Sequence, residues 1–170
     1  MAAELVDWRD FFVTTATVAG ALIGLLFVAV SLHVRVFTDE EHSDLRLDAR
    51  AILLGYVVAM GVSLFPLIPQ SLAALGQEML LVFVFILVTS ARSIPTLFRP
   101  SAAYGLRSRS FRLASFIFGC AATLSGALGL MAGQAWPLQL LAASVIVLIV
   151  ASVLRTWDIV FRAARVAPPA

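Results

Sequence analysis

Charged residues are scarce in this chain. Asp, Glu, Lys and Arg make up 13% of its 170 residues, whereas they make up about 25% of a typical soluble domain. Hydrophobic residues account for 61% of the sequence, and the mean hydropathy is +1.00. This composition leaves no room for a separate soluble domain and predicts that most of the chain lies in lipid.

Lysine is absent, so all twelve basic residues are arginines. Together with the abundance of Ala, Val, Leu and Gly, this bias suggests a bacterial protein encoded by a GC-rich genome. The net charge is only +2, and the arginines lie at the ends of apolar segments instead of along one face, which argues against nucleic-acid binding. Cysteine occurs once, as Cys120, which excludes an internal disulfide and a multi-cysteine metal site.

Catalytic signatures are also missing. The sequence contains no phosphate-binding Walker loop, no HExxH or GxSxG motif and no dinucleotide-binding fingerprint. His33 and His42 flank an acidic run, but the residues Thr38 to Glu41 also form a capping box at the start of a helix, which accounts for the acidic side chains. We therefore predict a protein that is not an enzyme and that has no metal and no cofactor.

Long apolar stretches dominate what is present. Residues 11–34 contain no Asp, Glu, Lys or Arg, and about 20 apolar residues suffice for a helix to cross the hydrocarbon core of a bilayer. Further apolar stretches cover 51–67, 78–94, 113–132 and 138–156. The sequence thus predicts an all-α polytopic bundle of five transmembrane helices in a single membrane domain.

The arginines predict how this bundle is oriented. Cytoplasmic segments of membrane proteins are enriched in Lys and Arg. Every arginine except Arg9 lies in or beside the segments 35–50, 95–112 and 157–170, which five spans would place on one side of the membrane. We therefore expect two cytoplasmic loops and a cytoplasmic tail, with the N-terminus out and the C-terminus in, in the inner (plasma) membrane of a bacterium.

The loop 95–112 carries a cluster of basic side chains that allows two interpretations. The arginines are topology determinants, or they also bind the head groups of anionic lipids. The residues concerned are Arg99, Arg107, Arg109 and Arg112.

Small residues recur every four positions in three of the predicted spans. This spacing puts them on one face of a helix, where a second helix can approach closely. We interpret these faces as packing seams within the bundle, or against a second copy or another membrane protein, and a pore lining is the alternative. The residues are Ala16, Gly20 and Gly24 in the first span, Gly55 and Ala59 in the second, and Ser125 and Gly129 in the fourth.

Glu78 is a candidate intramembrane polar site. The helix between Glu78 and Arg92 would be about 21 Å long, whereas the hydrocarbon core is about 30 Å thick. One of the two charges would therefore lie below an interface, and ionisable groups at such depths often serve a function. The alternative is a short span in a tilted or locally thin arrangement.

The segment Trp8–Ser31 resembles the start of small uncharacterised bacterial inner-membrane proteins with several spans. It reads W-R-D-F-F and then G-L-L-F-V-A-V-S, and in that group a W-x-x-F-F start leads into a G-L-x-F-V-A-x-S helix. The resemblance extends to the T-W-D segment at Trp157 after the last span. Members are sometimes labelled as modulators of a membrane protease, and the resemblance implies no catalytic residue.

Two functions from different classes follow from these features. The first is a non-enzymatic accessory or interaction subunit, which oligomerises or binds a membrane partner through its small-residue faces. The alternative is a small channel or transporter that uses Glu78 and the threonine-rich face of the first span, Thr14, Thr15 and Thr17. A membrane enzyme is the weakest hypothesis, because no paired acid, base or nucleophile lies at one depth.

Overall fold

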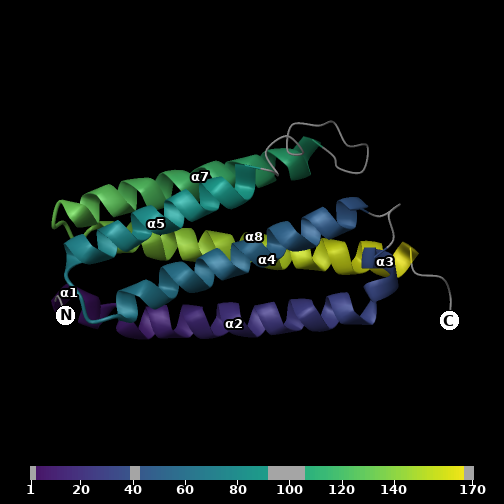
Figure 1. Ribbon diagram of the computed structural model, residues 1–170, viewed down its shortest axis with the longest axis horizontal. Coiled ribbons are helices and arrows are strands. Elements are labelled where there is room, and N and C mark those ends of the chain that lie inside the picture. The colour runs from purple at the N-terminus through teal and green to yellow at the C-terminus, as the bar shows by residue number, and fades with distance from the viewer. Residues whose placement is uncertain (1–2, 39–42, 92–105, 167–170) are drawn as a thin grey trace.

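Long antiparallel helices make up the structure (Figure 1). The computed structural model describes residues 3–38, 43–91 and 106–166, and all regular structure in these ranges is helical. The elements are α1 (Ala3–Asp7), α2 (Arg9–Leu32), α3 (Val34–Thr38), α4 (Ser43–Leu64), the 3-10 turn η2 (Phe65–Leu67), α5 (Leu72–Ala91), α7 (Leu106–Met131) and α8 (Pro137–Val166).

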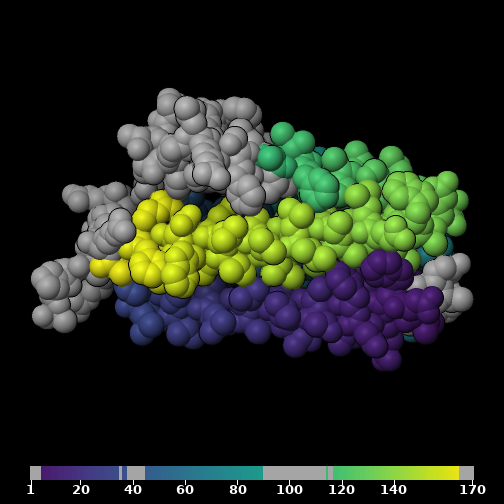
Figure 2. All heavy atoms as spheres, turned by 180° about the vertical axis from the view of Figure 1, so that it is seen from behind, coloured from purple at the N-terminus to yellow at the C-terminus, as the bar shows by residue number. Residues whose placement is uncertain are grey.

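The helices α2, α4, α5, α7 and α8 run alternately in opposite directions, so the N-terminus and the C-terminus lie at opposite ends of the bundle (Figure 1). The most extensive contact is between α5 and α7, while α4 packs on both α2 and α8, and α7 packs on α8. Figure 2 shows α2 and α8 side by side, with α7 on the other flank of α8. By contrast, α4 and α5 contact each other sparsely although they follow one another in the chain.

Among the described residues, four helices are long and apolar enough to cross a membrane. Their candidate spans cover 9–32, 45–67, 72–89 and 137–164, and the apolar part of α7, residues 117–131, is shorter. The predicted all-helical bundle is therefore confirmed for the described residues, and its apolar helices indicate a membrane-embedded protein. The number of crossings and the orientation stay predictions.

Proline, serine and glycine set the turns between helices. Pro66 lies in η2, where the α-helical hydrogen-bonding pattern of α4 ends. The Oγ of Ser71 accepts a hydrogen bond from the backbone N–H of Ala74 at 3.2 Å and so caps the start of α5. Gly133 has a φ of 75°, which closes the turn after α7, and Pro137 begins α8.

Helix α5 begins earlier in the chain than the sequence predicted. The helix begins at Leu72, whereas the sequence placed a third span over 78–94. The cap from Ser71 lets the helix begin about 1.7 turns earlier, so Glu78 is an internal residue of α5 instead of its first residue.

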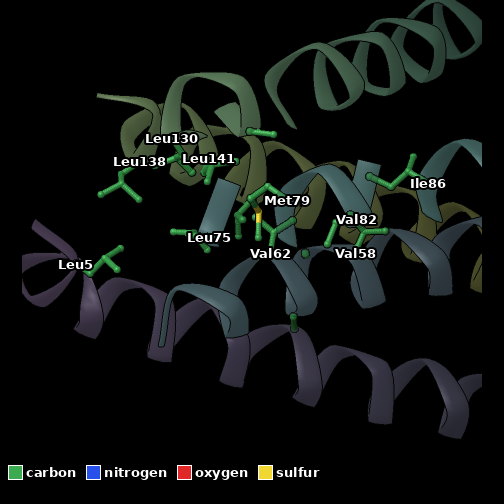
Figure 3. Packing of buried hydrophobic residues seen from close by; sticks show 14 residues of the cluster. Leu5, Val58, Val62, Leu75, Met79, Val82, Ile86, Leu130, Leu138 and Leu141 are labelled. Carbon is green, nitrogen blue, oxygen red and sulfur yellow. The ribbon is translucent and has the colours of Figure 1, made fainter. Parts of the chain in front are cut away.

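The buried core has two parts. The larger one joins side chains of α2, α4, α5, α7 and α8, and includes the fully buried Val62, Met79 and Leu141 (Figure 3). The smaller one lies towards the C-terminal end of α8 and is built around Tyr56 of α4 and Ile159 of α8. The two parts together fix α4 against α2 on one side and against α8 on the other.

Candidate functional sites

The predicted small-residue face of α2 is split between the inside and the outside of the bundle. Ala16 is 9% exposed and belongs to the inward face, together with Phe12 and Ala19. Gly20 and Gly24 are exposed, and a Cβ added to either glycine would meet nothing within 4 Å. The described part of the chain therefore leaves the Gly20–Gly24 face open.

The predicted small residues of α4 lie at close helix contacts. Ala59 is fully buried, and a Cβ on Gly55 would overlap the Oγ of Ser152 in α8. In α7, a Cβ on Gly129 would lie 2.6 Å from the Cγ of Pro137. Ser125 differs, because it is exposed and its hydroxyl donates to the carbonyl oxygen of Ala121 at 2.6 Å within its own helix.

Sequence reasoning missed a close contact between α5 and the backbone of α7. A Cβ on Gly76 of α5 would lie 2.7 Å from both the carbonyl oxygen of Ala127 and the backbone nitrogen of Met131. Gly76 lies between the spans predicted over 51–67 and 78–94, so the sequence predicted no packing role for it. The usable signal is the helical spacing of the apolar residues Leu72, Leu75 and Met79 around it.

A polar seam between α4 and α8 was also missed. Arg162 donates from Nη2 to the Oδ2 of Asp48 at 3.1 Å, and both side chains are partly buried. Further along, the hydroxyl oxygens of Tyr56 and Thr156 are 3.0 Å apart. Because the partners are about 100 residues apart in sequence, no local spacing pattern reveals them.

Glu78 has a hydrogen-bond partner in the connection between α4 and α5. The Nε2 of Gln70 donates to the Oε2 of Glu78 at 2.7 Å and to the carbonyl oxygen of Phe65 at 3.0 Å. Glu78 is half-buried. Its carboxyl group is thus linked to η2 through the side chain of Gln70.

The three threonines of the first span do not share one polar face. Thr15 donates to the Oγ of Ser63 in α4 at 2.9 Å. Thr14 and Thr17 are exposed, and their hydroxyls donate to the carbonyl oxygens four residues earlier at 2.7 Å and 2.8 Å. Successive helix residues are about 100° apart, so Thr14 and Thr17 lie within about 60° of each other on the exposed side of α2, whereas Thr15 is turned towards α4.

Three arginines of the predicted basic cluster lie at the start of α7. Helix α7 begins at Leu106, inside the segment that the sequence predicted to be a loop, so its first two turns hold Arg107, Arg109 and Arg112. This helix start lies at the same end as the start of α4 and the end of α8 (Figure 1). Arg99 lies outside the described residues.

An apolar groove separates α4 from α5. It has a volume of about 290 Å³. Its lining residues come from α4, η2 and α5, and they are Val57, Val58, Gly61, Phe65, Leu81, Val82 and Phe85.

Metal ligation finds no support in the described ranges, which contain no group of three or more His, Cys, Asp or Glu side chains that could hold a metal ion. His42 lies outside these ranges. Comparison with known proteins adds no relative, since no protein family, curated protein or solved structure matches the chain.

Proposed function

We propose that the chain is a five-span protein of the bacterial inner membrane that acts as a non-enzymatic interaction subunit. In this proposal it associates with a transmembrane helix of a second copy, or of another membrane protein, through the Gly20–Gly24 face of α2. The observation that carries the proposal is the open space beside both glycines. Small residues four positions apart let two helix backbones approach closely in lipid, and the protomer leaves this face unused.

The surroundings of the glycines support a helix as the partner. Thr17, Ala21 and Val28 are exposed on the same side of α2, which extends the face over about three turns. The hydroxyl of Thr17 already donates within its own helix, so the face can be buried in lipid or protein without leaving this donor unsatisfied.

Cross-linking in membranes tests this proposal. We expect Ala21→Cys, in a Cys120→Ala background, to form a cross-linked dimer, because Ala21 lies beside the two glycines. Adding Gly20→Leu and Gly24→Leu should lower the dimer fraction by about tenfold, which corresponds to about 1.4 kcal/mol of association free energy. The matched control is Val88→Cys, since Val88 is 66% exposed on α5 and should not cross-link.

The leucine variant separates self-association from binding to another protein. If Ala21→Cys forms no dimer, affinity purification from native membranes should recover a membrane protein that the leucine variant fails to retain. The protomer itself should be at least as stable as the wild type, because neither leucine enters a packed site and leucine favours a helix over glycine. Equal recovery of every membrane protein by both chains, with no dimer, contradicts the proposal.

The proposed topology makes a separate prediction. A reporter that is active only in the cytoplasm should work when fused after Ala170 or inserted near Tyr104, and should fail at the N-terminus and near Gln134. The alternation of the five long helices and the arginines at the ends of α7 and α8 support this arrangement. Cytoplasmic activity of the insertion near Gln134 would refute five spans.

A further inference from the structure

The apolar groove between α4 and α5 has a floor and two walls. Val58 and Val82, which are 5% and 9% exposed, form the floor, and their side chains lie close together in Figure 3. Leu81 and Phe85 form the α5 wall and are exposed at 69% and 48%. Gly61 lies in the α4 wall, and a Cβ at this position would meet nothing within 4 Å. The groove is therefore open to the outside of the bundle, and no α4 side chain fills it at Gly61.

One end of this groove is polar. Phe65 lines the groove, and its carbonyl oxygen accepts a hydrogen bond from Gln70, which also donates to Glu78. Leu81, Val82 and Phe85 follow Glu78 by three, four and seven residues, the spacing of one helix face. Glu78 thus lies at the Phe65 end of the groove, in line with its α5 wall.

The length of the groove selects the occupant. From Phe65 to Val57 the helix rises by about 12 Å, which is close to half of the roughly 30 Å hydrocarbon core. A transmembrane helix needs the whole thickness, whereas the acyl chain of one lipid occupies a single leaflet. A carboxylate at one end and apolar walls along the rest therefore match an amphiphile better than a second helix.

The charge at the polar end selects the head group. Glu78 is the only Asp, Glu, Lys, Arg or His residue within α5. A carboxylate offers about four lone-pair sites, and the hydrogen bond from Gln70 occupies one of them. An ammonium group can use the remaining sites in a charge-assisted hydrogen bond, whereas a head group with only anionic and hydroxyl groups gains no such pairing.

We infer that the groove binds one acyl chain of a phospholipid whose head group carries a primary ammonium, as in phosphatidylethanolamine, and that the Glu78 carboxylate receives this ammonium. The inference does not depend on the Gly20–Gly24 face, which lies on α2. It gives Glu78 a role in lipid recognition that requires neither a pore nor transport.

Photolabelling tests both halves of the inference. The full-length protein is placed in nanodiscs of phosphatidylglycerol that contain traces of a phosphatidylethanolamine or a phosphatidylglycerol probe with a photoactivatable acyl chain. We expect the phosphatidylethanolamine probe to label peptides 57–65 and 81–85 about tenfold more strongly, the change that one charge-assisted hydrogen bond produces. Glu78→Gln, which keeps the shape of the side chain, should abolish the preference.

Gly61→Leu should fill the groove and lower labelling by both probes. The matched control is Ala143→Leu, because Ala143 is exposed on α8 and does not line the groove. The control should label like the wild type, and both variants should keep the wild-type circular dichroism spectrum. If Gly61→Leu failed to fold, Glu78→Gln would still test whether the Glu78 carboxylate selects the ammonium head group.

Three results would overturn the inference. The first is equal labelling of the wild-type groove by the two probes. The second is labelling that persists in folded Gly61→Leu. The third is a cross-link between two chains at the groove, which would identify a second copy as the occupant.

Discussion

Gly76→Ala is expected to lower the free energy of unfolding by about 2–3 kcal/mol, the usual cost of forcing extra atoms into a packed site. The added Cβ would lie 2.7 Å from the carbonyl oxygen of Ala127 and from the backbone nitrogen of Met131. Both atoms belong to the backbone of α7, so no side-chain rotation relieves the overlap. The helices α5 and α7, whose contact is the most extensive in the bundle, would have to move apart.

Gly20→Ala provides the matched control for this prediction. A Cβ at Gly20 meets nothing within 4 Å, and alanine favours a helix over glycine by about 1 kcal/mol. This variant should therefore be as stable as the wild type or slightly more stable. Both are measured as unfolding of the purified protein in detergent, followed by circular dichroism. Equal stability of Gly76→Ala and Gly20→Ala would show that α5 and α7 do not meet at Gly76.

The sequence predicted the helices well because their signal is local. Uninterrupted apolar stretches indicate membrane-crossing helices, and Pro66 and Gly133 lie where the structure places turns. The start of α5 was harder to predict, because the segment from Gln70 to Gln77 also fits a short connection between two spans. The contact that starts the helix there is the capping hydrogen bond of Ser71, and the length of an apolar stretch does not reveal such a contact.

The surroundings of the small residues were not predictable from their spacing. Gly20 and Gly55 both belong to rows with a four-residue repeat, yet one faces open space and the other faces Ser152. A repeat shows that residues share one helix face, but the rotation of that face towards or away from the bundle depends on the neighbouring helices. The same reason hides the pair of Asp48 and Arg162, whose two partners lie on α4 and α8.

Tyr56→Ala is expected to destabilise the bundle by about 3–5 kcal/mol, the range for removing a buried aromatic ring. Tyr56 is 1% exposed and lies in the smaller part of the core with Ile52 and Ile159. The other helices there are α2, α3 and α8, and closing the cavity would require them to shift together. The loss should appear as a lower unfolding temperature and as exposure of α8 to proteolysis from its C-terminal end.

Tyr56→Phe isolates the hydroxyl group from the ring. Thr156 donates its hydrogen to the carbonyl oxygen of Ser152 at 2.9 Å, so Tyr56 must be the donor in the 3.0 Å hydrogen bond to Thr156. Removing the Tyr56 hydroxyl leaves the hydrogen bond from Thr156 to Ser152 intact, so the free energy of unfolding should fall by only about 1 kcal/mol. A phenylalanine variant as unstable as the alanine variant would mean that the hydrogen bond, and not the packing of the ring, holds α4 against α8.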